Sequence, residues 1–258
     1  GDHRWFYTEI PPTVEKLLQA DDMNNCFEDI QSFCRNQGTE YFGVADLTQV
    51  HDEVYRQGGD FVRTYSKAIV FGIVLQDSVV NLVTSDIQGA KSIYSHHAYQ
   101  VINTRLDILT SWIADIIQKN GFSAFPVPAS LRFDNERICS IFSHKLAARQ
   151  AGFGWIGKSC MLITPEHGPR VRWGSVLTDA PFPAVSKPMD EQCGKCQACV
   201  DICPVQAFTG EPFREGEPRE VRYAAALCDQ YFQNMKEHQE EPVCGLCLYV
   251  CPYGRKNR

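Results

Sequence analysis

The sequence predicts a mixed α/β (α+β) fold, with a larger α/β domain followed by a smaller cysteine-rich module. Residues 68–75 form an apolar run broken by one glycine, as expected for a central strand covered on both faces. Residues 94–119 carry apolar side chains at helical spacing and are followed by an Asn-Gly pair that favours helix termination. Most of the 12 cysteines lie in the last quarter of the chain. These three observations predict a layered domain and a separate metal-binding module.

Length and composition agree with a globular protein of two parts. The chain has 258 residues, of which 44% are hydrophobic and 22% charged. That length is sufficient for one large domain with a substantial core and one small domain. The formal net charge of −6 argues against a surface that binds nucleic-acid phosphates, because such surfaces carry a basic excess.

Targeting signals are not evident in the sequence. The longest apolar run is far shorter than the roughly 20 residues that span a bilayer. The first residues lack the charged and apolar regions of a secretory signal. The cytoplasm is therefore the predicted compartment.

Shorter patterns predict the remaining elements. We expect helices at residues 13–20, 22–37 and 140–150, and strands at residues 41–47, 161–164 and 171–178. The Pro-containing residues 125–128 are expected to form a rigid extended connector.

Proline-dotted residues 180–188 show no periodicity, so we place the domain boundary there. The predicted domains are residues 1–180 and residues 188–258. A polar insertion at residues 210–219 separates the two halves of the cysteine module.

The cysteine spacing predicts two iron–sulfur clusters. The first run reads C-x2-C-x2-C-x3-C and is followed by Pro204, which is the pattern of bacterial two-cluster ferredoxins. A second run reads C-x2-C-x3-C, is followed by Pro252, and has one further cysteine upstream. In such modules the fourth cysteine of a run binds the other cluster. This crossed rule assigns one [4Fe-4S] cluster to Cys193, Cys196, Cys199 and Cys251, and the other to Cys203, Cys228, Cys244 and Cys247.

Zinc and disulfides are the alternative uses of these cysteines. C-x2-C pairs also bind Zn2+, but zinc has no need of the evenly spaced run with its crossed repeat. Disulfides are disfavoured because a chain of this size and apolar content needs no disulfide framework. Cys26, Cys34, Cys139 and Cys160 lie outside the two runs, and we expect them to be buried structural thiols.

A glycine-rich segment, Gly152-Phe153-Gly154-Trp155-Ile156-Gly157-Lys158-Ser159, satisfies both the G-x-G-x-x-G and the G-x-x-x-x-G-K-[ST] nucleotide patterns. Both patterns require a strand before the loop and a helix after it, whereas the predicted order here is reversed. Two interpretations remain. The segment is either a tight turn with Trp155 in the core, or a bare backbone surface on which a large flat ligand lies beside Trp155 and Lys158.

The glycine segment, the following Val176-Leu177-Thr178-Asp179 and the doubled cysteine module together resemble epoxyqueuosine reductases, relatives of the reductive dehalogenases. The resemblance implies a nitroreductase-like domain that binds cobalamin, a corrinoid, which two [4Fe-4S] clusters reduce. It also implies a low-potential electron donor such as ferredoxin or flavodoxin as a partner. Carried over by position, the residues expected to line the corrinoid are Gly152, Gly154, Trp155, Gly157 and Lys158.

The sequence departs from this family in two respects. An acidic proton donor precedes the glycine segment in epoxyqueuosine reductases, but ungapped counting reaches Ile138 or Cys139 here. Asp134 and Glu136 lie nearby, so the catalytic residue is left unassigned. Longer members continue into helical repeats that help to hold tRNA, whereas this chain stops shortly after Cys251. We therefore expect a short member that acts on a small molecule.

The predicted function is that of a cobalamin-dependent iron–sulfur reductase. The alternative is a ferredoxin-type electron-transfer protein that reduces the cobalt of a partner corrinoid protein, which needs no proton donor at the loop. Flavin on the nitroreductase-like scaffold is a third possibility. We expect His96, His97 and His144 to be ordinary hydrogen-bonding residues.

Overall fold

A four-stranded antiparallel sheet forms the centre of the molecule. The computed structural model describes residues 20–255, and side chains from residue 24 onward. The strand order is β1-β2-β6-β3, and a separate two-stranded sheet pairs β4 with β5. The strands are β1 (Tyr41–Asp46), β2 (Lys67–Val74), β3 (Ala124–Val127), β4 (Trp155–Ile156), β5 (Leu162–Ile163) and β6 (Val171–Thr178).

Helices connect and cover these strands. The α-helices are α1 (Ala20–Asn36), α2 (His51–Arg63), α3 (Asp77–Val80), α4 (Ala90–Ser95), α5 (Ile102–Lys119), α6 (His144–Gln150), α7 (Ala198–Asp201), α8 (Ala225–Glu237) and α9 (Leu246–Val250). Shorter turns are η2 (Thr48–Val50), η3 (Asn81–Thr84), η4 (His96–Val101), η5 (Arg219–Val221) and η6 (Pro252–Arg255), of which η4 is a π-helix.

Strand β2 confirms the prediction of a central strand buried on both faces. It pairs antiparallel with β1 on one side and with β6 on the other. Ile69 and Phe71 point into the core cluster that contains the α1 and α5 side chains, whereas Ala68 and Val70 point into the opposite cluster. The side chains alternate between faces because successive residues of a strand point in opposite directions.

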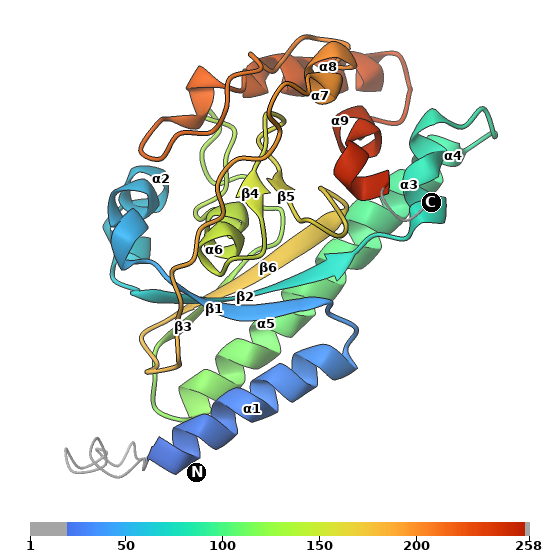
Figure 1. Ribbon diagram of the computed structural model, residues 1–258. Coiled ribbons are helices and arrows are strands. Elements are labelled where there is room, and N and C mark those ends of the chain that lie inside the picture. The colour runs from blue at the N-terminus through green and yellow to red at the C-terminus, as the bar shows by residue number, and fades with distance from the viewer. Residues whose placement is uncertain (1–19, 256–258) are drawn as a thin grey trace, which may run out of the picture.

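The sheet is covered on both faces, which confirms the mixed α/β fold class. Helices α1 and α5 lie along one face, and α6 with the β4–β5 hairpin lies on the other (Figure 1). The cysteine module, which contains α7, α8 and α9, lies beyond that hairpin (Figure 1). The hairpin is therefore the layer between the sheet and the cysteines.

Three elements differ from the sequence-based expectations. Residues 124–127 form the edge strand β3 rather than a connector. Pro126 is tolerated there because a residue of an edge strand can face solvent with the backbone position at which proline lacks an N–H. Helix α6 begins at His144 and not at residue 140, because the Ser143 hydroxyl accepts a hydrogen bond from the Leu146 amide and caps the helix. The long helix begins earlier, at Ala90, and passes through η4.

Helix α2 is absent from the sequence-based expectations. Two glycines interrupt its pattern, and Gly59 has φ of 72°, which kinks the helix. The helix expected at residues 13–20 lies outside the described residues, apart from Ala20 as the first residue of α1.

The segment between the sheet and the module is tied to the sheet domain. The Val185 amide donates to the Val44 carbonyl at 2.9 Å, and the Asp46 amide donates to the Val185 carbonyl at 2.8 Å. The Lys187 amide donates to the Gln150 carbonyl at 2.8 Å. Val243 and Leu248 of the module are buried in the core cluster that contains α5. The boundary at residues 180–188 stays a prediction, and the two parts share an extensive packed contact.

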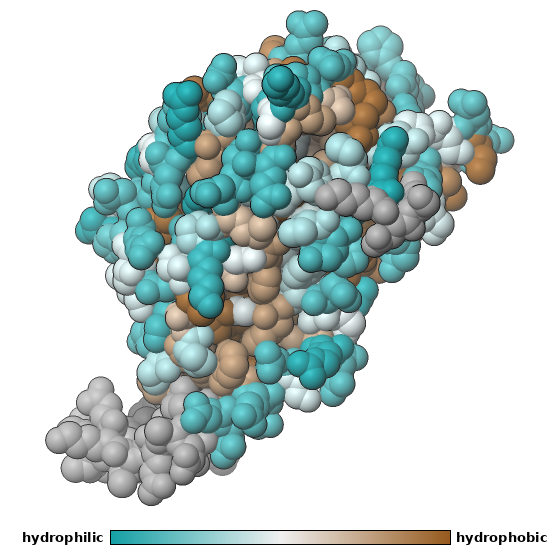
Figure 2. Space-filling model, viewed as in Figure 1, coloured by the Kyte–Doolittle hydropathy of each residue, from teal (hydrophilic) through white to brown (hydrophobic). Residues whose placement is uncertain are grey.

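Hydrophilic side chains cover most of the face seen in Figure 2, with apolar atoms visible between them. Within residues 20–255, no helix combines the length and apolar character needed to traverse a lipid bilayer.

Candidate iron–sulfur site and adjoining cavities

The first cysteine set lies where the module meets the glycine segment. Cys193, Cys196, Cys199 and Cys251 line one small cavity together with Lys158 and Tyr253. Cys251 directly follows α9 and lies more than 50 residues beyond Cys193 in the chain. The tertiary structure therefore brings the last cysteine of the second run to the first three cysteines of the first run.

The cysteines of the second set lie close enough together to raise one another's pKa values. Thiolates at Cys203 and Cys228 raise the pKa of Cys244, after the larger effect of burial. Burial raises the pKa of Cys247 to about 12, and Cys244, Cys228, Cys199 and Cys203 add to it. The contribution of Cys199 means that the two sets adjoin.

The raised pKa values couple metal binding to proton release. Burial is the main cause that raises the pKa of Cys193 and of Cys199 to about 11. The Lys158 backbone amide and the Trp155 indole lower the pKa of Cys193, but less than burial raises it. Cysteine binds metal as the thiolate, so cluster assembly must displace protons from these sulfurs.

Among residues 24–255, no three His, Cys, Asp or Glu side chains lie close enough together to hold one metal ion. In a cuboidal cluster each thiolate binds a different iron, whereas the four ligands of a zinc site all contact one ion.

The glycine segment forms the support of the first cysteine set. Helix α6 precedes it and the β4–β5 hairpin contains its end, which is the reverse of the order in nucleotide-binding loops. Lys158 is buried, and its Nζ donates to the carbonyls of Gly194 at 2.8 Å and Cys196 at 3.2 Å. Trp155 is fully buried, and its ring contacts the Tyr253 ring edge-on with centroids 4.7 Å apart. The segment is thus packed against protein on the side of the cysteines.

The glycines of this segment are also in close contact with protein. A Cβ at Gly157 would lie 2.7 Å from Ile163 and 3.3 Å from the Cys193 sulfur. A Cβ at Gly154 would lie 2.0 Å from the Ile163 carbonyl oxygen, and one at Gly152 would lie 3.2 Å from the Lys187 carbonyl oxygen. The corrinoid-lining role of Gly152, Gly154, Trp155, Gly157 and Lys158 stays a prediction, and their packing favours a role in supporting the cysteines.

A larger cavity, which we call the junction cavity, lies between the sheet and the cysteine module. Its volume is about 270 Å³. Its walls are mainly apolar, and its polar side chains are those of His144, Lys145 and Arg172. Leu248, next to the second-set residue Cys247, closes it on the module side. The complete lining is Ala129, His144, Lys145, Met161, Leu162, Pro169, Val171, Arg172, Trp173 and Leu248.

His144 is held as a neutral imidazole in the wall of the junction cavity. Its Nε2 lies 3.1 Å from the Pro128 carbonyl oxygen and its Nδ1 lies 2.9 Å from the Ser175 hydroxyl. The carbonyl requires a proton on Nε2, so Nδ1 accepts from Ser175. Burial lowers the pKa of His144 from 6.5 to about 4. Both ring nitrogens are thus occupied, as expected for a structural histidine.

Acidification is therefore expected to destabilise the protein through His144. The unfolded chain binds a proton below pH 6.5 and the folded chain below about pH 4, so stability falls as the pH drops through this window. The loss is at most about 3 kcal/mol, since one pKa unit corresponds to ~1.4 kcal/mol and the side chain is partly exposed. Urea unfolding at pH 7 and pH 4.5 measures it. His144→Gln keeps a hydrogen-bond donor and an acceptor without titrating, so the free energy of unfolding of H144Q should depend less on pH in this window. An unchanged pH dependence in H144Q would mean that other groups cause the destabilisation.

The remaining predicted cysteines and histidines are found in ordinary surroundings. Cys26 and Cys34 are buried in the core on α1, and burial raises the pKa of Cys34 to about 12. Cys160 is buried beneath the module, as expected. Cys139 is only partly buried, which corrects the expectation of a buried thiol, and its backbone pairs with that of Asp134. The more exposed His96 and His97 are close to side-chain amides of Gln100 and Gln76.

Of the two acidic residues near the expected proton-donor position, Asp134 is engaged within its own loop. The Asp134 carboxylate accepts hydrogen bonds at 2.9 Å from the backbone amides of Glu136 and Arg137. Glu136 is exposed. The junction cavity has no Asp or Glu among its lining residues. The catalytic residue therefore stays unassigned.

Comparison with known proteins confirms the resemblance. Residues 192–254 match the 4Fe-4S double cluster binding domain family. Over 163 residues the chain is 31% identical to an epoxyqueuosine reductase of Pseudomonas aeruginosa, a match that covers 61% of this chain and 41% of the relative. Over 116 residues it is 34% identical to an epoxyqueuosine reductase of Bacillus cereus, covering 43% of this chain and 29% of the relative. The chain thus spans less than half the length of these curated relatives.

Solved structures share the fold over most of this chain. An epoxyqueuosine reductase from Streptococcus thermophilus superposes with a TM-score of 0.53 at 18% identity, covering 90% of this chain and 66% of the other. A reductive dehalogenase, described with a mechanism for B12-dependent dehalogenation, superposes with a TM-score of 0.61 at 20% identity, covering 89% of this chain and 32% of the other. At these identities the superpositions establish the common fold.

Proposed function

We propose, from its relationship to epoxyqueuosine reductases and the fold it shares with a B12-dependent dehalogenase, that this chain is an iron–sulfur reductase whose electron acceptor is a corrinoid. The observation that carries the proposal is the convergence of the cysteines into two adjoining sets, of which the second adjoins the junction cavity through Leu248, next to Cys247. One set would hold each [4Fe-4S] cluster, with Cys193, Cys196, Cys199 and Cys251 around the first. Cys203, Cys228, Cys244 and Cys247 would surround the second.

The junction cavity has the chemistry expected of a corrinoid site. Apolar walls with a few converging polar groups are typical of cofactor pockets. Lys145 and Arg172 would meet the polar edge of the ligand, and Trp173 and Leu162 would cover its face. At about 270 Å³ the cavity is smaller than the roughly 300–1,000 Å³ of a drug-sized site, so the junction must open to admit a corrinoid. A bound corrinoid would supply a cobalt centre that accepts low-potential electrons from the clusters.

Corrinoid uptake by the reconstituted protein tests this proposal. After anaerobic cluster assembly and incubation with cobalamin, the protein should elute from gel filtration with about one cobalt per chain. Met161→Trp would fill the junction cavity and should abolish uptake while iron is retained. Met189→Trp, on the segment outside both cavities, is the matched control and should bind like wild type. Full iron content without cobalt in the wild-type protein would refute a resident corrinoid.

A second candidate is reduction of cobalt held by a partner corrinoid protein. Two observations favour it: the junction cavity is small and it has no carboxylate to supply a proton. Cys196 is exposed, so the first set lies close enough to the surface for electron transfer to another protein. In this case the reduced protein should transfer electrons to an added cob(II)alamin-containing protein, and Met161→Trp should transfer at the wild-type rate. The resident-corrinoid proposal requires Met161→Trp to be inactive.

A further inference from the structure

A second cavity, which we call the insertion cavity, has a strongly cationic lining. It has a volume of about 140 Å³ and lies between α2, the loop before α6 and the polar insertion at residues 210–219. The whole protein has a formal net charge of −6, so a concentration of positive charge here needs a physical explanation. The charged lining residues are Arg56, Arg137, Lys145, Arg219 and Arg222, against Glu53 and Glu217.

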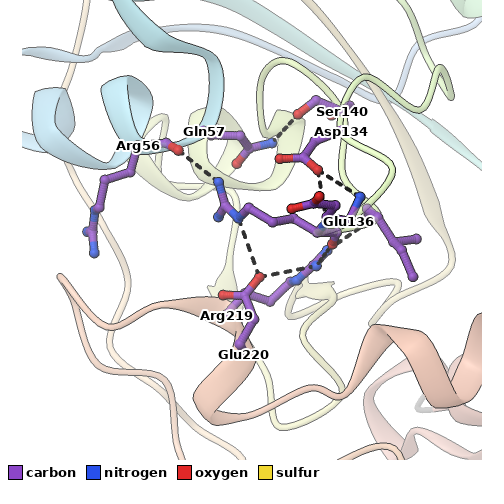
Figure 3. A network of polar contacts seen from close by, with 9 residues as sticks. Arg56, Gln57, Asp134, Glu136, Ser140, Arg219 and Glu220 are labelled. Carbon is purple, nitrogen blue, oxygen red and sulfur yellow. Dashed lines mark hydrogen bonds and ion pairs between the residues drawn. The ribbon is translucent and has the colours of Figure 1, made fainter.

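Three of these cations hold the walls of the cavity together. Figure 3 shows the contacts that connect α2, the 134–140 loop and Arg219. Arg56 donates to the Gly216 carbonyl and Arg137 donates to the Arg56 carbonyl, each at 2.8 Å. Arg219 donates to the backbone carbonyls of Ile138, at 3.1 Å, and Arg137. Their hydrogen bonds fix the insertion to the sheet domain.

Lys145 and Arg222 are different because they lack a counter-ion. Arg222 is 3% exposed, and its Nε has no hydrogen-bond partner among the described residues. Its Nη1 donates weakly to the Cys160 sulfur at 3.5 Å, and its guanidinium stacks on Phe213 at 4.8 Å. Lys145 Nζ donates to the Cys160 carbonyl at 2.5 Å. Within residues 24–255, neither side chain forms a salt bridge.

Two adjacent cations in a protein interior are unfavourable unless an anion compensates them. Burial lowers the pKa of Lys145, and repulsion from Arg219 and Arg222 lowers it further. A bound oxyanion would remove this repulsion and accept the unused Arg222 Nε–H in a charge-assisted hydrogen bond. We propose that the insertion cavity binds the carboxylate or phosphate group of a small molecule, held by Arg222 and Lys145.

The shape of the insertion cavity limits the ligand. A volume of about 140 Å³ accommodates a small oxyanion or a short organic acid, and Leu146, Ile156 and Phe213 offer an apolar side to its body. Lys145 also lines the junction cavity, so an anion bound in the insertion cavity would lie next to the junction cavity. The inference goes beyond the proposed function, since anion binding is measured without any corrinoid.

Calorimetry with simple anions tests the site. The cluster-loaded protein is titrated with sodium phosphate and, separately, with sodium acetate, at an ionic strength kept constant with sodium chloride. We expect saturable binding of at least one anion with a Kd below about 10 mM. Phosphate alone would indicate a phosphate ester as the natural ligand, acetate alone a carboxylate, and both a general oxyanion site.

Two substitutions within the same module provide the contrast. Arg222→Met removes the buried charge and should weaken binding at least about tenfold, because one charge-assisted hydrogen bond and one cation are lost. Arg214→Met is the matched control, since Arg214 is on the insertion, is 66% exposed and does not line the cavity. It should bind like wild type. If Arg222→Met loses its iron, Lys145→Met gives the same comparison.

Two results would overturn the inference. The first is no saturable binding by the wild-type protein below about 10 mM, and the second is equal affinity in R222M and R214M. The first result can be accompanied by a change in the reduction potential of a cluster in R222M. That outcome would assign the two cations to charge compensation of the second cysteine set, whose Cys247 also influences Lys145.

Discussion

Cys251→Ala is expected to abolish the same cluster as Cys193→Ala, although the two residues belong to different runs of the sequence. The physical reason is that Cys251 lines one cavity with Cys193, Cys196 and Cys199. Each variant should fall from about eight irons per chain to about four, because each cluster contains four irons. Cys203→Ala should remove the other cluster, as should Cys247→Ala. Iron and sulfide analysis after anaerobic reconstitution measures the loss.

Electron paramagnetic resonance then identifies which cluster is left. C251A and C193A should retain one common reduced-cluster signal, and C203A and C247A should retain a different one. Cys26→Ala, which removes a buried thiol on α1, is the control and should keep all irons. A signal shared by C251A and C247A but not by C193A would mean that each run holds its own cluster. The crossed assignment would then be wrong.

Gly154→Ala should be among the most destabilising single substitutions in the sheet domain. Its Cβ would be placed 2.0 Å from the Ile163 carbonyl oxygen, and a backbone atom cannot turn away as a side chain can. The β4–β5 hairpin would have to shift, at a cost of about 3 kcal/mol. For a chain of this length that corresponds to a fall in Tm of about 6–12 °C. Thermal unfolding of the cluster-loaded protein measures it.

Gly59→Ala separates crowding from backbone conformation. Gly59 has φ of 72° and ψ of −161°, a conformation essentially restricted to glycine, but nothing lies within 4 Å of an added Cβ, so alanine there costs about 1–3 kcal/mol from backbone conformation alone. G154A should also lose iron from the first cluster, because the displaced hairpin contains Lys158, whose Nζ donates to the Gly194 and Cys196 carbonyls. Equal stability losses in the two variants, with full iron in both, would argue against a supporting role for the hairpin.

The sequence predicted the elements whose signals are local. The continuous apolar run became β2, and the helical periodicity of residues 94–119 became α5 with the turns before it. Local patterns failed where another element decides the outcome. Residues 124–127 form a strand because β6 offers a free edge, and Ser143 delays the start of α6 by capping it. Helix α2 was missed because its two glycines mask its pattern.

For the candidate site, the sequence by itself determined the ligand chemistry. The cysteines of one run are separated by two or three residues, so a local turn is enough to bring their sulfurs to one cluster. The tertiary structure decided what surrounds those cysteines. That the glycine segment lines a corrinoid stays a prediction, whereas its packing is decided by the fold: Ile163 of the same hairpin lies against Gly154 and Gly157, and Tyr253 from the end of the chain packs on Trp155. The pairing of Lys145 with Arg222 is likewise tertiary, since 77 residues separate them and only the packing of the cysteine module against α6 brings their charges into one cavity.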